Sequence, residues 1–316
     1  MSVTQDLKRR AAELGFLACG ITDPSPLAQP DRLDSWLARG YAGTMRYLHR
    51  QANRRKDPRL IVPGALSVVV ALDNYYRGED DSAGAPPQVA RYAQGLDYHR
   101  ITRRRLDLLG DFLRERGAGV AHSWADSGPV PERELAQRAG LGWIGKNTML
   151  IRPGAGSFFF IGSIFTDLAL DLDQPFDLDR CGTCTRCLDA CPTAALVEPR
   201  VLDATRCISY LTIEHRGPIP ESLADRLEGW VFGCDICNEV CPWNQRVAGP
   251  EPVAEFQPRG ALEADPELFE RMDEDEFARR FGDTPLERAG LVGMRRNFRA
   301  AFGKRAMPPV SARMSS

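Results

Sequence analysis

The feature that most constrains this chain is the crowding of its cysteines. The sequence has 316 residues and nine cysteines, and eight of the nine lie between Cys181 and Cys241. A disulfide-stapled scaffold is a short chain with a cysteine content above roughly 8%, so this density is too low for one. Thiols gathered into one segment instead indicate a metal site, because thiolate ligands must converge on what they bind.

The spacing of these cysteines indicates the kind of metal site. The first set reads Cys181-Gly-Thr-Cys184-Thr-Arg-Cys187-Leu-Asp-Ala-Cys191-Pro192, the pattern by which bacterial ferredoxins hold one 4Fe-4S cluster with three thiolates and reach a second with the fourth. A second set repeats the pattern with one cysteine fewer, and Cys207 can supply the missing ligand. Following the ferredoxin cross-over, we assign one cluster to Cys181, Cys184, Cys187 and Cys241, and the other to Cys191, Cys207, Cys234 and Cys237.

Structural zinc is the alternative for these cysteines, since zinc sites also use paired C-x2-C knuckles. Zinc has no use for a third cysteine at the same spacing followed by Cys-Pro, so the pattern favours iron-sulfur clusters. Cys19 stands apart in an apolar run, and we expect it to be a small core residue.

Composition excludes several other classes of protein. The charges nearly cancel, with 41 basic against 43 acidic side chains, and 43% of the residues are hydrophobic, unlike a disordered chain. The longest apolar runs, at 66–72 and 158–165, fall short of the roughly 18 residues of a membrane span. Charges stand where a signal peptide has its apolar core. We therefore expect a globular, monomeric, cytoplasmic protein that does not contact a membrane.

Hydrophobic periodicity predicts the elements of the first half. Helices are expected at 4–15, with Thr4 as the N-cap, at 98–116 and at 131–140, and strands at 16–21 and 67–72. The stretches 148–151 and 157–165 are expected to form a hairpin. The predicted fold class is α+β, and acidic residues before Cys181 mark a boundary. The expected parts are a mixed α/β domain (1–175), a ferredoxin-like double-cluster module (176–250) and a helical segment (251–316).

Two weaker signals precede the cysteines. Gly140-Leu-Gly142-Trp-Ile-Gly145 spells G-x-G-x-x-G but follows a helix and leads into a strand, the reverse of a dinucleotide fingerprint. It indicates either close backbone contact in a turn or backbone beside a large flat cofactor. Lys146, in a chain whose basic residues are mostly arginine, is either a surface residue or a donor to phosphate or to an amide-rich cofactor.

Asp126 is the candidate reactive side chain. It is either a turn residue that bonds its own backbone or a general acid, for which Trp124 and Trp143 would supply desolvation. Asp97-Tyr98-His99 matches part of a D-x-H-x-x-G cobalt-ligand pattern, but Thr102 replaces the glycine, so cobalt ligation by His99 is not expected. Basic groups at 54–56, 103–105 and 295–299 are either solvated faces or a track for phosphates.

Several motifs together resemble the epoxyqueuosine reductase family, over about residues 5–303. They are Leu135-Ala-Gln-Arg-Ala-Gly-Leu-Gly-Trp-Ile-Gly-Lys-Asn, Cys207-Ile-Ser-Tyr-Leu-Thr-Ile-Glu-His-Arg-Gly, Cys234-Asp-Ile-Cys237, and Thr284-Pro-Leu-Glu-Arg-Ala-Gly with Arg296-Asn297. The resemblance implies two 4Fe-4S clusters, a cobalamin bound by the first domain, and a fold related to that of reductive dehalogenases. The implied reaction reduces epoxyqueuosine to queuosine at the wobble position of tRNA, the last step of queuosine synthesis.

The resemblance also implies roles for individual residues. Asp126 matches the catalytic aspartate, a proton donor for loss of the epoxide oxygen, and an external low-potential donor would supply electrons. His215 and Arg216, with the basic stretch 291–305, are candidates for tRNA contact. Some members continue into a HEAT-like repeat, whereas this chain ends at Ser316 without one. Residues expected to line the corrin are Arg55, Ala90, Arg91, Asp126, Lys146, Ile161, Ser209 and Asp235.

Two other functions stay open. One is cobalamin-dependent reduction of a small molecule, as in reductive dehalogenases. The other is electron transfer by a two-cluster protein whose first domain docks a redox partner. Cobalt corrin absorption beside the iron-sulfur bands distinguishes the electron carrier from the two enzymes.

Overall fold

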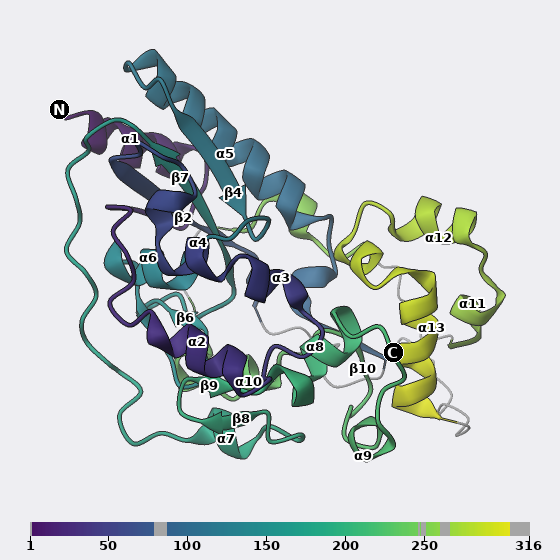
Figure 1. Ribbon diagram of the computed structural model, residues 1–316. Coiled ribbons are helices and arrows are strands. Elements are labelled where there is room, and N and C mark those ends of the chain that lie inside the picture. The colour runs from purple at the N-terminus through teal and green to yellow at the C-terminus, as the bar shows by residue number, and fades with distance from the viewer. Residues whose placement is uncertain (1, 79–86, 246, 248–250, 260–265, 304–316) are drawn as a thin grey trace.

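A four-stranded antiparallel sheet organises the first half of the chain (Figure 1). The computed structural model describes residues 2–78, 87–245, 247, 251–259 and 266–303. The strands lie in the order β1-β2-β7-β4, and β7 pairs with the whole of β2, so the two longest apolar strands form the centre. Their bounds are β1 (Ala18–Thr22), β2 (Ser67–Asn74), β4 (Ala121–Ala125) and β7 (Phe159–Thr166).

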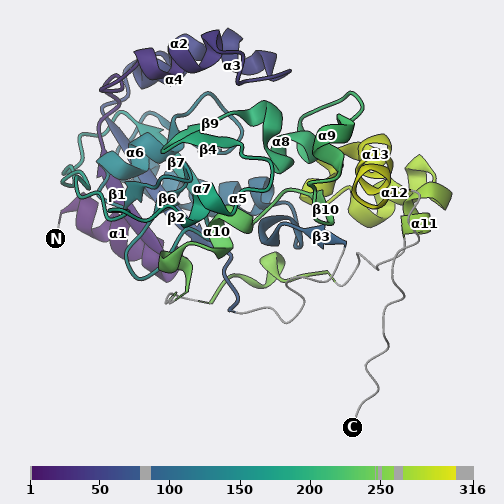
Figure 2. The same cartoon turned by 90° about the horizontal axis from the view of Figure 1, so that it is seen from below.

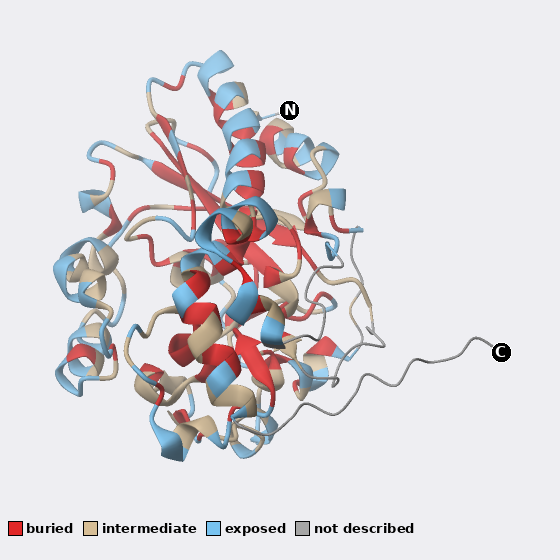
Figure 3. Ribbon diagram, turned by 90° about the vertical axis from the view of Figure 1, so that its right-hand side faces the viewer, coloured by how far each residue is buried: buried red, intermediate tan, exposed pale blue. Residues whose placement is uncertain are grey.

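Helices cover both faces of this sheet, and every residue of β2 is therefore buried. Val69 and Ala71 pack in the core that includes α1 and α5, whereas Val68 and Val70 pack in the core that includes α6. Successive side chains of a strand alternate between faces, so one continuous apolar run supplies both cores, which Figure 3 shows in red. The helices are α1 (Val3–Glu13), α5 (Tyr98–Glu115) and α6 (Glu132–Arg138).

Two expectations differ from the structure. The N-cap of α1 is Ser2 and not Thr4, because Ser2 and Gln5 form a reciprocal capping box. The expected hairpin of 148–151 with 157–165 is wrong: β6 (Leu150–Ile151) pairs with β5 (Trp143–Ile144). The apolar residues of β7 are buried at the centre of the sheet, which leaves β6 to pair with the segment before it.

Residues 31–60 form an arm that arches over the rest of the molecule, as Figure 2 shows. Two hydrogen bonds tie it to the cysteine segment: the Trp36 indole donates to the Leu202 carbonyl (2.6 Å), and the Thr44 N–H donates to the Tyr210 hydroxyl (2.8 Å). Its helices are too short for periodicity to predict them. They are α2 (Asp31–Ala38), α3 (Arg46–Arg50), α4 (Ala52–Lys56) and η1 (Pro58–Leu60).

The cysteine segment consists of very short elements. In both cysteine sets, the cysteine that precedes the Cys-Pro pair lies in a one-turn helix: Cys187 in α7 and Cys237 in α10. β10 pairs in parallel with β3, which joins this segment to the first domain. The bounds are β3 (Gln88–Val89), α7 (Arg186–Asp189), β8 (Leu196–Glu198), β9 (Val201–Leu202), α8 (Ile208–Ile213), α9 (Glu221–Ala224), β10 (Trp230–Phe232) and α10 (Ile236–Glu239).

The C-terminal segment is helical where the structure describes it. Buried Asn297 of α13 donates to the carbonyls of Thr212 and Val231, which fixes α13 against α8 and β10. One core joins Val89 and Phe298, so packing crosses the expected boundaries at 175 and 250. Residues 304 and 305 of the basic stretch lie outside the described residues. The helices are α11 (Pro266–Arg271), α12 (Glu274–Phe281) and α13 (Gly290–Phe302).

Short 3-10 helices complete the described chain: η2 (Arg91–Ala93), η3 (Ala204–Arg206), η4 (Pro242–Asn244), η5 (Ala254–Phe256) and η6 (Pro285–Arg288). Over the residues described, none of the helices has the length and apolar character needed to cross a membrane.

Candidate cluster ligands and candidate active site

Four cysteines line one cavity of about 280 Å³. They are Cys181, Cys184, Cys187 and Cys241. Burial, and then the charges of Cys241 and Cys181, raise the pKa of Cys187 to about 11, so these thiols act on one another. The four side chains that surround this cavity are those assigned to the first cluster.

The remaining four cysteines of the segment form a second group. Burial raises the pKa of Cys234 and of Cys237, and the charge of Cys207 raises both further. Burial also raises the pKa of Cys207, with an added contribution from Cys191. Thiols of this kind become ligands when a metal centre stabilises the thiolate. The structure brings together the same two sets that the spacing assigns, and their occupants stay a prediction.

The geometry also bears on the zinc alternative. In the part of the chain that the structure describes, no three Cys, His, Asp or Glu side chains are arranged to hold a metal ion. A structural zinc needs four ligand atoms at about 2.0–2.3 Å from one point, whereas a polynuclear cluster takes thiols that are spread more widely. An all-sulfur donor set around a cavity therefore fits a 4Fe-4S cluster.

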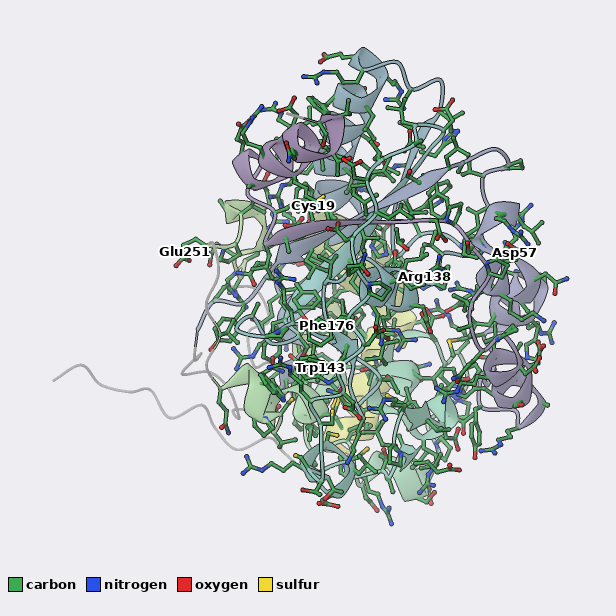
Figure 4. The ribbon with its side chains drawn as sticks, turned by 90° about the vertical axis from the view of Figure 1, so that its left-hand side faces the viewer. Cys19, Asp57, Arg138, Trp143, Phe176 and Glu251 are labelled. Carbon is green, nitrogen blue, oxygen red and sulfur yellow. The ribbon has the colours of Figure 1, made fainter. Side chains whose placement is uncertain are left out.

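Trp143 stands beside the first cysteine set. Its indole N–H points to Cys181 Sγ at 3.5 Å, and its ring stacks on Phe176 at 5.7 Å between centroids. Figure 4 shows these two rings together and Cys19 well away from them. The expectation that Trp143 desolvates Asp126 is wrong, because β5 places its indole against the cysteines. Cys19 packs against the core of α1 and α5.

The glycine motif serves backbone packing in the β5–β6 pair. A Cβ at Gly142 would lie 2.2 Å from the Ile151 carbonyl oxygen, so only glycine fits. This confirms the close-contact interpretation. Lys146 Nζ donates to the carbonyls of Gly182 (2.7 Å) and Cys184 (2.9 Å). Lys146 therefore holds the loop of the first cysteine set, at the wall of the cavity.

Asp126 directly follows β4, and 66% of its side chain is exposed. Its φ of 49° lies in the left-handed region, which costs a residue with a Cβ roughly 1–2 kcal/mol. The Tyr98 hydroxyl donates to Asp126 Oδ2 at 2.5 Å, and His99 Nε2 lies 3.8 Å from the same oxygen. The carboxylate is therefore held at the start of α5 and remains open to a ligand.

Two further side chains hold the turn after Asp126. Glu132 Oε1 accepts the Asp126 N–H at 2.7 Å, and Arg55 donates to the carbonyls of Gly128 (3.2 Å) and Val130 (3.5 Å). Desolvation, and then the charge of Asp126, raise the pKa of Glu132 to about 8. Sequence reasoning missed Glu132, because an acid in the first turn of a helix is ordinary there.

Ala90, Arg91 and Asp235 meet where β3 joins β10. Asp235 is 2% exposed, and its Oδ2 accepts the Arg91 N–H at 2.7 Å. Desolvation raises the pKa of Asp235 to about 6. Ala90 is fully buried, and a Cβ on Gly233 would lie 2.6 Å from its Cβ. Three of the expected corrin-lining residues are therefore adjacent.

An aromatic wall connects this group to Asp126. The rings of Tyr98 and Phe160 stack at 4.1 Å, and Tyr92 meets Tyr98 edge-on at 5.8 Å. Burial, and then the charges of Asp126 and Asp235, raise the pKa of Tyr92. Both carboxylates therefore act on the same wall.

Two unpaired donors indicate that a ligand belongs near these groups. Within the described structure, the Nε atoms of Arg55 and Arg91 are buried and have no hydrogen-bond partner. Buried donors are normally satisfied, and the amide carbonyls at the periphery of a corrin would satisfy these. The residues present therefore fit a cobalamin.

The other candidate residues have local roles. Ile161 lies in β7, and Ser209 hydrogen-bonds Cys207, which lowers the pKa of that thiol against the larger effect of burial. His215 Nε2 lies 3.0 Å from the Pro218 carbonyl oxygen, and Arg216 donates to the carbonyls of Ala289 and Arg288. Arg295 and Arg296 also donate mainly to backbone carbonyls, so α13 uses these arginines for its own packing.

Two family models match the chain. The model described as "Epoxyqueuosine reductase QueG, DUF1730" matches residues 55–127, and the model described as "4Fe-4S double cluster binding domain" matches residues 180–244. The second match spans both cysteine sets.

Curated relatives match nearly the whole chain. It is 42% identical over 298 residues to the epoxyqueuosine reductase of Cyclobacterium marinum, which covers 93% of this chain and 95% of that protein. The identity to the Pseudomonas aeruginosa enzyme is 43% over 309 residues, covering 95% and 85%. The identity to the Escherichia coli enzyme is 38% over 309 residues, covering 95% and 81%.

Solved structures share its mixed α+β fold. A selenomethionine-labelled epoxyqueuosine reductase superposes with a TM-score of 0.83 at 31% identity, and one bound to an epoxyqueuosine-modified tRNA-Tyr stem loop with 0.82 at 31%. Each match covers 95% of this chain and 82% of the other. A Bacillus subtilis epoxyqueuosine reductase, with its catalytic aspartate loop swung out of the active site, gives 0.80 at 30% identity over the same shares.

Proposed function

This chain belongs to the epoxyqueuosine reductase family, and we propose that it reduces epoxyqueuosine in tRNA with Asp126 as proton donor. The protein is an oxidoreductase with a 4Fe-4S double-cluster domain. The observation that carries the proposal is 43% identity over 309 residues, which includes both the cysteine segment and the domain that holds Asp126.

The reaction sets what the chain must provide. Epoxide and two electrons with two protons give alkene and water: both C–O bonds break, and a C=C bond forms in the cyclopentene ring. An external low-potential donor supplies the electrons, since the chain contains no net reductant of its own. The protein therefore needs an electron path and a placed proton donor.

The cysteines provide the electron path. Cys181, Cys184, Cys187 and Cys241 would hold one cluster, and Cys191, Cys207, Cys234 and Cys237 the other. Cobalamin, when bound, supplies a cobalt centre that reduces the epoxide. Arg55 and Arg91 would bond its amide carbonyls through their unpaired Nε atoms, beside Ala90 and Asp235. Lys146, Ile161 and Ser209 are further proposed contacts.

Asp126 donates the proton to the epoxide oxygen as the first C–O bond opens. The carboxylate that remains accepts the Tyr98 hydroxyl at 2.5 Å, and a hydrogen bond to a charged acceptor is about twice as strong as a neutral one. Tyr98 therefore stabilises the form of Asp126 that the reaction produces. Because Asp126 is mostly exposed, solvent can return the proton.

The arm provides a surface for the tRNA backbone. Arg46, Arg50 and Arg54 are exposed at intervals of four residues on α3 and α4, and Arg50 and Arg54 line a shallow hollow. The same arm contacts the Asp126 turn through Arg55. We place the phosphate contacts here, with His215 and Arg216 as further candidates. The structure of a relative with a modified tRNA stem loop supports an RNA partner.

Nucleoside analysis of tRNA from a strain that lacks this protein tests the function. We expect epoxyqueuosine to accumulate and queuosine to return with the wild-type gene but not with Asp126→Asn. Normal queuosine in the deletion strain, with no second enzyme present, would contradict the proposal and favour a small-molecule reductase or an electron carrier.

Substrate binding, location and assembly are tested separately. Arg50→Glu with Arg54→Glu should raise the KM for tRNA at unchanged kcat, whereas Arg9→Glu on α1 should not. We propose that the protein acts as a monomer in the cytoplasm, which size-exclusion chromatography and cell fractionation check.

A further inference from the structure

The turn that carries Asp126 is held from two sides by residues outside it. Glu132, at the start of α6, accepts the Asp126 N–H at 2.7 Å. Arg55, on α4, donates to the carbonyls of Gly128 and Val130 at 3.2 and 3.5 Å. Three backbone groups of a five-residue turn are therefore bound by two side chains.

The turn does not hold this conformation by itself. A φ of 49° at Asp126 is costly for a residue other than glycine, and it persists only where surrounding contacts impose it. Gly128 lies against Trp124, where a Cβ would come within 2.5 Å of the ring. In the Bacillus subtilis relative the loop of the catalytic aspartate is swung out of the active site, so in that protein such a loop has a second position.

We infer that Glu132 and Arg55 are positioning residues that hold the Asp126 turn closed, and that the Glu132 hydrogen bond sets how often Asp126 is presented to substrate. The inference rests on the proposed role of Asp126. It assigns Glu132 no contact with substrate or cofactor. When the turn opens, Glu132 loses its N–H donor, and Arg55 and Arg133 are the cations whose charges still act on it. Tyr98 faces the same turn from α5.

Hydrogen exchange of the turn, followed by mass spectrometry on the cluster- and cobalamin-loaded protein, tests this without using turnover. Loss of a hydrogen bond to a charged group should speed exchange of the amides at 126–130 about tenfold or more in Glu132→Ala. Glu132→Gln keeps an oxygen that accepts the Asp126 N–H, so its exchange and turnover should stay close to wild type. Glu134→Ala is the matched control, because Glu134 lies on the same helix and no contact of its side chain with the turn is described.

The kinetics of the same variants complete the test. We expect Glu132→Ala to lower kcat in step with the gain in exchange, while the KM for tRNA is unchanged. Exchange in Glu132→Ala as slow as in wild type would overturn the inference, as would faster exchange with full kcat. A Glu132→Gln variant as impaired as Glu132→Ala would also overturn it.

Two outcomes separate this inference from its neighbours. If Glu132→Ala fails to fold, Arg55→Met tests the other anchor: faster exchange of the amides near Gly128 supports the clamp, and unchanged exchange overturns it. If Asp126→Asn has full turnover, the catalytic role of Asp126 fails, and the exchange data still report whether Glu132 holds the turn.

Discussion

The Tyr98 hydroxyl lies 2.5 Å from Oδ2 of Asp126, so the first residue of α5 meets the residue that follows β4. The ring of Tyr98 is stacked on Phe160 of β7 at 4.1 Å with an interplanar angle of 3°, which fixes the direction of its hydroxyl. The sheet thereby positions a carboxylate that projects beyond it.

Tyr98→Phe should keep the stacked ring and lose only the hydrogen bond to Asp126. Because that bond stabilises the carboxylate formed on proton donation, we expect kcat to fall about 10-fold to 100-fold, as for a hydrogen bond to a charged group. Single-turnover kinetics with loaded protein measure it. Wild-type kcat in this variant would show that Tyr98 does not stabilise Asp126 during the reaction.

Cys241→Ala should remove one ligand of the first cysteine set. We expect the reconstituted protein to lose about four irons per chain, the content of one cluster. Cys19→Ala is the matched control, because Cys19 packs against the core of α1 and α5, and its iron content should equal that of wild type. Iron and sulfide analysis decides, and equal iron in both variants would contradict the ligand assignment.

Asp73 and Arg105 form a buried ion pair, with side chains 1% and 7% exposed. Asp73→Ala leaves the Arg105 guanidinium buried without its counter-ion, which should lower the free energy of unfolding by about 3–5 kcal/mol. Asp111→Ala breaks the exposed pair with Arg114 and should cost no more than about 1 kcal/mol. Urea denaturation compares the two, and equal losses would contradict this difference.

Glu132 should make stability depend on pH. Its pKa in the folded protein is raised from 4.5 to about 8, so between these values the folded state binds more protons than the unfolded state. The free energy of unfolding therefore falls as pH rises through this interval, and the contribution is lost above the folded pKa. Glu132→Gln should flatten this slope, and Glu134→Gln should not. Urea midpoints measured across the interval check the sign.

The sequence predicted those parts of the fold whose pattern is local. β2 and α5 were found because each carries a long periodic or apolar run, and the cysteine sets because their spacing is fixed by the cluster that they would hold. The pairing of β6 with β5 was missed, since nothing local indicates that β7 belongs at the centre of the sheet. The neighbours of Asp126 depend on tertiary contacts: Tyr98 precedes it by a long helix, and Glu132 has the ordinary sequence context of a helix start.

The pairing of β3 with β10 has a consequence for synthesis. Val89 and Phe232 are paired in one two-stranded sheet, yet Phe232 leaves the ribosome long after the first domain has been made. Until then Arg91 has no Asp235 to accept its N–H, and the core that joins Val89 to Phe298 is incomplete. Domains emerge in order during translation, so a truncated chain that ends before β10 can complete the central sheet and still lack half of the cofactor site. Competence to react is therefore acquired at the end of synthesis, and an abandoned nascent chain carries none of it.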